Sequence, residues 1–135
     1  MTTTVPATEF SAPCTQFLRR NISEADEGLG ELVVGVLPAG AIVMSAGVVV
    51  ATAWNGTTPI LDIGTSDDPD DFATDLALGT KGRIVADEMA TADNIYSTTE
   101  ETVTCTVAAT GNDSTAGFGV VYVEFIPNTG NGRVS

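Results

Sequence analysis

Residues 102–126, TVTCTVAATGNDSTAGFGVVYVEFI, decide the fold class of this chain. Between residues 103 and 109 one set of apolar side chains alternates with Thr104, Thr106 and the small Ala108. A period of two predicts a half-buried β-strand, because successive side chains of a strand point to opposite faces. The Gly- and Asn-rich segment 111–117 predicts a loop, and residues 118–126 predict a returning strand that Pro127 ends. We therefore expect an antiparallel hairpin with a threonine-rich outer face.

Two further strands are predicted for residues 32–37 and 41–54, joined at the turn Pro38-Ala-Gly40. The second run is unusually long for one strand, so we expect a bulge or bend at Gly47. The side chains on one face of this run are predicted to lie in the hydrophobic core: Ile42, Met44, Ala46, Val48, Val50, Thr52 and Trp54. The opposite face is small but still largely apolar: Val43, Ser45, Gly47, Val49, Ala51 and Ala53. This second face therefore needs cover, either from a second sheet or from a neighbouring subunit.

Turn residues divide the rest of the chain into short strands. Asn55-Gly56 predicts a tight turn, because both residues accept positive φ at little cost, and residues 60–63 predict a short returning strand. Strands separated by turns every 8–12 residues or so are typical of a sandwich or barrel and not of alternating β/α units. We expect an all-β fold with antiparallel strands.

The predicted domain organisation has three parts. Residues 32–127 form the β-sandwich domain, and residues 128–135, rich in Gly and Asn, form a flexible C-terminal tail. Residues 1–31 lack sustained periodicity and predict an extended N-terminal arm or irregular lead-in. A first strand near residues 15–18 is an equal alternative.

Acidic residues are densest between residues 62 and 75, where two interpretations compete. Calcium binds several carboxylate oxygens, and the candidate ligands are Asp67, Asp68, Asp70 and Asp71. Their spacing does not match the EF-hand loop. The same residues fit the start of a short helix, with Asp68 as N-cap, Pro69 in the first turn and Gly79 as the stop. We expect the short helix and no bound metal.

Composition excludes most catalytic and nucleic-acid functions. The 135-residue chain has 18 acidic and 5 basic residues, no His, and a net charge of -13. Contact with phosphates or an anionic membrane depends on Lys and Arg, so neither partner is expected. Without His, a Ser or Cys nucleophile lacks its usual base, and Lys81, the only lysine, lies in a Gly-Thr-Lys-Gly turn. We expect no enzyme activity and no cofactor.

The two cysteines and the N-terminal residues indicate the cellular compartment in which the protein folds. Cys14 and Cys105 are too few for a disulfide framework and form no metal-binding pair, and Cys105 is predicted to be a buried thiol. The start of the chain shows no secretory signal, so we expect folding in a cytoplasm. The weakly charged segment 32–54 is interrupted by Gly and Pro, which argues against a membrane-spanning helix.

Residues 37–72 resemble small structural proteins of tailed bacteriophages. Leu37-Pro-Ala-Gly40 precedes AWNGTTPILDIGTSDDPDDF, residues 53–72. In that family an aromatic-Asn-Gly-Thr turn leads to a Gly-x-Ser/Thr-x-Asp-Pro-Asp-x-Phe segment within a jelly-roll-like domain. The resemblance implies a jelly-roll-like antiparallel β-sandwich or barrel, here with one short helix and an extended N-terminal arm.

The resemblance also implies a function carried by surfaces. Such proteins are head decoration, cement or fibre components that assemble as oligomers. We expect a non-enzymatic decoration or cement protein of the virion, assembled in the host cytoplasm as a homo-oligomer such as a trimer, with the major capsid protein or other virion proteins as partners. Candidate subunit contacts are Phe10, Phe17, Leu18, Val43, Val49 and Ala51. The alternative is a fibre or adhesin-type module that recognises host glycan through loops 55–58 and 111–117.

Overall fold

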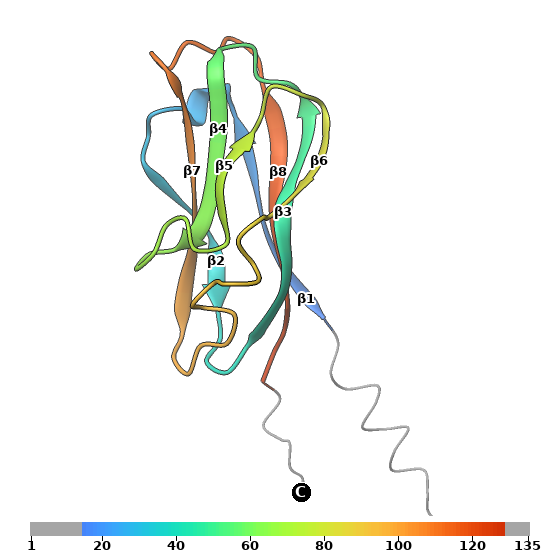
Figure 1. Cartoon of the computed structure of the whole chain (residues 1–135), viewed down its shortest axis with the longest axis vertical. Helices are drawn as coiled ribbons and strands as arrows, with labels where there is room; N and C mark the ends of the chain where they lie inside the picture. The colour runs from blue at the N-terminus through green and yellow to red at the C-terminus, as the bar shows by residue number, and fades with distance from the viewer. Residues whose placement is uncertain (1–14, 129–135) are drawn as a thin grey trace, which may run out of the picture.

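The computed structural model describes residues 15–128, which form two stacked β-sheets and a single 3-10 turn (Figure 1). In chain order the elements are β1 (Gln16–Ser23), η1 (Glu24–Asp26), β2 (Glu31–Leu37), β3 (Ile42–Thr52), β4 (Thr57–Thr65), β5 (Ala73–Ala77), β6 (Gly82–Val85), β7 (Glu101–Thr110) and β8 (Phe118–Ile126). Sheet A has the order β1-β8-β3-β6 and sheet B the order β2-β7-β4-β5. Neither sheet contains a parallel pair.

The strand pairing is nested. β1 pairs with β8, β2 with β7, β3 with β6 and β4 with β5, as if one long antiparallel hairpin with its tip at β4–β5 had been rolled into two layers. This pairing is jelly-roll-like, and most connections cross from one sheet to the other. The expected all-β antiparallel sandwich is confirmed.

The predicted hairpin over residues 102–126 is wrong, although its two strands are confirmed. β7 lies in sheet B and β8 in sheet A, so loop 111–117 crosses between the layers. The turn Pro38-Ala-Gly40 likewise connects strands of different sheets. Alternation along a strand specifies which face is buried, but it does not specify which strand lies alongside, so the pattern does not distinguish a hairpin from two strands in different sheets.

Of the two alternatives for the N-terminal part of the chain, an irregular lead-in or a first strand, the described residues show a first strand. β1 pairs with β8 over its whole length, from Gln16 opposite Phe125 to Ser23 opposite Phe118. Arg20 Nη1 donates a hydrogen bond to the Val33 carbonyl oxygen at 2.9 Å, which ties β1 of sheet A to β2 of sheet B. The sandwich therefore includes residues that precede the predicted boundary at residue 32. Residues 1–14 and 129–135 lie outside the described part of the chain.

β3 keeps the predicted alternation only in its middle. Residues 46–50 alternate as expected, with the even-numbered side chains buried. The pairing register with β8 shifts between Val43 and Ser45, and again between Val50 and Thr52. Each shift is a β-bulge or local irregularity, so the strand is interrupted on both sides of its middle.

The first of these shifts reverses the faces of the residues before it. Val43 points into the core and is 4% exposed, whereas Ile42 and Met44 are exposed, so the predicted faces of these three residues are wrong. Gly47, the predicted site of a bulge, pairs in regular register with Tyr122. Because both faces of this run are apolar, the pattern contains no signal for the extra residue.

The predicted short helix is also wrong. Residues 66–72 form turns in which the Asp71 amide donates to the Asp68 carbonyl oxygen at 3.1 Å, and the next residues form β5. In β5 Leu76 pairs with Leu61 of β4, and Asp75 adopts a positive φ of 56°. An Asp-Pro-Asp sequence is as suitable for a turn as for a helix N-terminus, and pairing with β4 outweighs the weak local helix preference. None of the helices in residues 15–128 is long and apolar enough to cross a membrane.

The core lies between the facing sides of the two sheets. Its largest fully buried side chains are Phe72, Ile22, Leu37, Leu61, Ile63, Leu78, Val48, Val50, Val103, Val107, Val121 and Val123. Trp54, which follows β3, is 2% exposed and lies against the backbone of Gly117 and Gly119. These two glycines leave room for an indole ring that larger residues would displace.

Replacing Gly117 with Ala should destabilise the fold, because its new Cβ would lie 2.5 Å from Trp54 Cδ2. Such overpacking typically lowers the free energy of unfolding by about 1–3 kcal/mol. Urea unfolding followed by the fluorescence of the single Trp measures this loss. Gly79→Ala is the matched control, since its nearest atom would be Pro59 Cγ at 3.8 Å. Equal midpoints for the two variants would contradict the packing at Trp54.

The buried thiol of Cys105 should be unreactive in the folded protein. Cys105 is free and fully buried, and burial raises its pKa from 9.0 to about 12. In a Cys14→Ser variant, a disulfide reagent at mildly alkaline pH should label the protein only after denaturant is added. The unfolded thiol ionises first as pH rises from 9.0 towards 12, so its contribution to stability declines over that window. Rapid labelling without denaturant would contradict the burial of Cys105.

Candidate functional site

The outer face of sheet A is apolar and carries a shallow depression. Phe17 on β1 is 60% exposed and Val85 on β6 is 57% exposed. The depression has a volume of about 640 Å³ and is lined by Phe17, Arg19, Val49, Arg83, Val120 and Tyr122. All four strands of sheet A contribute, so the surface exists only once the sheet has formed. We call these six residues and Val85 the apolar–arginine face.

The strand register brings these residues together from distant parts of the chain. Arg19 lies opposite Tyr122 of the central strand β8. Val49 of β3 lies between Val120 of β8 and Arg83 of β6. Alternate residues of neighbouring strands share a face, so the side chains form adjacent rows across the sheet.

Tyr122 and Arg83 hold each other in place on this face. Arg83 Nε donates a hydrogen bond to Tyr122 Oη at 3.0 Å, and the guanidinium carbon lies 5.1 Å from the centre of the ring. Gly47 makes this possible, because a Cβ there would lie 2.7 Å from Tyr122 Oη. The ring therefore lies across β3 towards β6. The exposed guanidinium of Arg83 is held by a hydrogen bond and a cation–π contact.

Charge is divided between the two sheets. The strands of sheet A contain three arginines, Arg19, Arg20 and Arg83, and a single acidic residue, Glu124. Glu124 accepts a hydrogen bond from Ser45 Oγ at 3.0 Å. The strands of sheet B contain no Lys or Arg and four acidic residues, Glu31, Asp62, Asp75 and Glu101. Arg20 reaches the Val33 carbonyl oxygen of sheet B, so the outer face of sheet A carries Arg19 and Arg83 among its apolar side chains in a chain with a net charge of -13.

The predicted contact residues are distributed unevenly over the structure. Phe17 and Val49 belong to the apolar–arginine face, and Ala51 is exposed beside the second shift in β3. Val43 is buried, and Leu18 is partly buried and packs against the core, so both side chains point away from the apolar–arginine face. Phe10 lies outside the described residues.

Sequence reasoning missed five residues of this face: Arg19, Arg83, Val85, Val120 and Tyr122. One signal was present: in residues 118–126, Val121 and Val123 alternate with Val120 and Tyr122. If the first pair is core, the second pair is an apolar outer face. The arginines gave no signal, because their position next to Tyr122 depends on pairing between β1, β3, β6 and β8.

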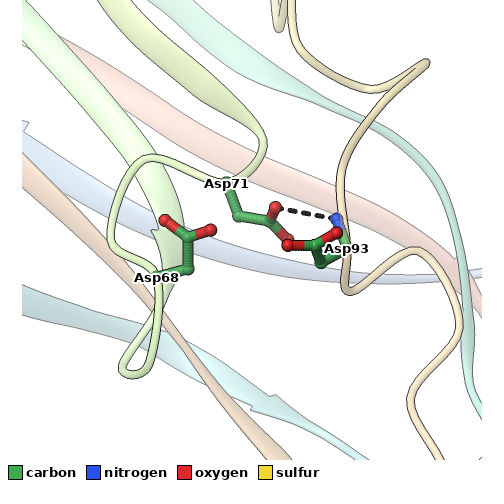
Figure 2. A group of neighbouring side chains, drawn as sticks. All are labelled: Asp68, Asp71 and Asp93. Carbon is green, nitrogen blue, oxygen red and sulfur yellow. Dashed lines mark hydrogen bonds between the residues drawn. The ribbon is translucent and has the colours of Figure 1, made fainter.

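The acidic stretch forms a different arrangement around Asp71 (Figure 2). Carboxylate oxygens of Asp68, Asp71 and Asp93 lie within 4.8 Å of one another. Asp71 is 7% exposed and accepts hydrogen bonds from the backbone amides of Asp93 at 2.8 Å and Asn94 at 2.9 Å. Of the predicted ligands, Asp68 and Asp71 belong to this group, and Asp93 was missed because it is distant in sequence.

These contacts are those of a structural clasp between loop 66–72 and residues 93–94. Both oxygens of Asp71 already accept amide hydrogens, whereas calcium requires six to eight oxygen ligands. The pKa of Asp68 is raised, first by its hydrogen bond with Asp70, then by burial and by the neighbouring carboxylates. Asp67 and Asp70 are exposed and lie outside the group.

The two loops predicted to bind glycan are bonded to each other. Thr57 donates to Asp113 through its amide at 2.8 Å and its hydroxyl at 2.9 Å, and these bonds lower the pKa of Asp113. Asn55 Oδ1 accepts from the Thr115 amide at 2.8 Å, and the Ser114 amide donates to Glu27 Oε1 at 3.1 Å. Many polar groups of loops 55–58 and 111–117 are therefore used inside the protein.

Comparison with known proteins shows a fold shared with chains of phage capsid structures. A scan against protein-family models found no match, and a search of curated proteins also found none. A chain in the acid-stable capsid structure of Helicobacter pylori bacteriophage KHP30 matches with a TM-score of 0.62 and 18% identity, over 83% of this chain and 86% of that one.

Two further matches agree with the first. A chain of the cyanophage Pam1 capsid asymmetric unit has a TM-score of 0.59 and 17% identity, over 85% of this chain and 86% of the other. A chain of the Ralstonia phage GP4 capsid has a TM-score of 0.63 and 19% identity, over 85% of this chain and 83% of the other. Because coverage is high in both directions, the matched chains are similar in length to this one.

Replacing Asp71 with Ala should destabilise the protein by about 1–3 kcal/mol, because the part-buried amides of Asp93 and Asn94 would each lose their acceptor. Chemical unfolding, in calcium and again in chelator, measures the change. The loss should be the same in both solutions, since it arises from hydrogen bonds of the protein itself. Asp67→Ala, at an exposed position of the same loop, should change the midpoint little. A loss seen only in calcium would instead indicate a metal site.

Proposed function

We propose that this chain is a non-enzymatic capsid decoration or cement protein of a tailed bacteriophage. The observation that carries the proposal is the fold, which is shared over most of the chain with similarly long chains from three phage capsid structures. The protein would assemble in the host cytoplasm as a homo-oligomer and bind the major capsid protein or other virion proteins. It would stabilise the particle through these contacts.

The surface of the protein supports a role in assembly. The apolar–arginine face combines aromatic, aliphatic and arginine side chains, a composition enriched at protein–protein interfaces. The acidic residues that the sequence concentrates between positions 62 and 75 include Asp71, which accepts backbone amides in a structural clasp. The sequence contains no His to activate a nucleophile.

A glycan-binding fibre module is less well supported by the structure. Its loops, 55–58 and 111–117, direct several polar groups to each other and to Glu27. A sugar site needs polar groups that converge on a ligand, together with an aromatic platform. Trp54, the single Trp, is buried beneath Gly117 and Gly119.

Capsid binding provides the direct test. Purified protein should co-sediment saturably with capsids that lack it, and decorated capsids should release their DNA at a higher temperature. Val49→Asp should weaken binding, because a charge would replace an apolar side chain in the face that joins neighbouring copies, and separated copies bind the shell with less avidity. Thr98→Asp adds the same charge at an exposed loop position outside sheet A and should bind normally.

Absence of binding by the unaltered protein would contradict the proposal. A specific signal on a glycan array in the same preparation would favour the fibre module instead. Because both assays use the folded full-length chain, they separate the two functions directly.

A further inference from the structure

We propose that the apolar–arginine face of one molecule binds the outer face of sheet B of a second copy, in a front-to-back interface. The proposal deepens the proposed function by naming the partner of this face. It concerns contacts between identical chains and not contacts with the capsid shell. It rests on how charged and apolar side chains are divided between the two sheets.

The outer face of sheet B has the complementary character. Val33 and Val36 on β2 are 53% and 44% exposed, so this face is also partly apolar. Glu31 is exposed on the same strand and lies in one row with Thr106 of β7 and Asp62 of β4. Carboxylates therefore accompany the apolar residues here, as arginines do on sheet A.

Charge complementarity favours this pairing over the two symmetric ones. If sheet A faced sheet A, the interface would hold Arg19 and Arg83 of both copies against a single carboxylate from each, Glu124, which already accepts a hydrogen bond from Ser45. If sheet B faced sheet B, only acidic residues would meet. Sheet A against sheet B brings guanidinium groups to carboxylates, and like charges at an interface are strongly unfavourable.

The geometry suits such stacking. Both faces are outer surfaces of sheets, and sheets pack face to face about 10 Å apart. The guanidinium of Arg83 is held in place by Tyr122, so little side-chain freedom would be lost when a carboxylate binds. Contacts of this front-to-back type join each molecule to two neighbours, and they form a closed ring when the rotation between neighbours closes and an open stack when it does not.

Light scattering during size-exclusion chromatography of the isolated protein tests this interface. The unaltered protein should be oligomeric, and the oligomer should weaken as salt is added. Arg19→Glu/Arg83→Glu, which alters sheet A, should raise the dissociation constant roughly 10–100-fold and leave monomers. Glu31→Arg/Val33→Arg, which alters sheet B, should do the same.

Mixing the two variants is the decisive measurement. Each retains the face that the other has lost, so the mixture should regain an oligomer, which would also show that both variants are folded. A mixture that stays monomeric overturns the proposal. So does an oligomer that survives Glu31→Arg/Val33→Arg, since sheet A would then bind itself.

The outcome is independent of the capsid assay. A monomer at every concentration of the unaltered protein overturns the proposal even if capsids bind it, and would assign the apolar–arginine face to the shell. If the oligomer forms as described but capsids do not bind it, the front-to-back interface stands and the decoration function fails.

Discussion

Burial of one face of every strand is the constraint on which this structure depends. The side chains that the two sheets direct towards each other are mostly apolar, and the nested pairing brings them together around Val48, Leu61, Val103 and Val121. Six of the seven connections therefore place the next strand in the opposite layer, and only the connection from β4 to β5 stays within one sheet. The turn at residues 38–40 and the loop at residues 111–117 cross between the sheets for this reason.

Burial of the inner faces does not restrict which side chains lie on the two outer faces of the sandwich. On sheet A the positions that alternate with the core are filled by Phe17, Val49, Val120 and Tyr122, where a solitary domain would carry polar residues. The side chains of this face are also held in defined positions. Because Gly47 has no side chain, the Tyr122 ring has room to reach Arg83. An exposed apolar patch held in one conformation is typical of a protein that works through contacts.

The acidity of the chain has a partly structural explanation. Asp71, Asp113 and Glu27 each accept hydrogen bonds from backbone amides of another segment, so these carboxylates hold loops together. Asp62 accepts the amide of Asp75 at 2.8 Å, and burial raises its pKa despite this bond. Backbone amides are obligatory donors, and in loops without a ladder partner a carboxylate satisfies them.

The sequence by itself determined the fold class, the extent of β8 and the buried side of β7. These properties follow from alternation and from turn residues within about ten positions, which are local signals. It did not determine that β7 and β8 lie in different sheets, that residues 73–77 form a strand in place of a helix, or that Asp93 approaches Asp71. Only the tertiary structure decided these features and the division of charge between the sheets, because each depends on pairing between residues far apart in the chain.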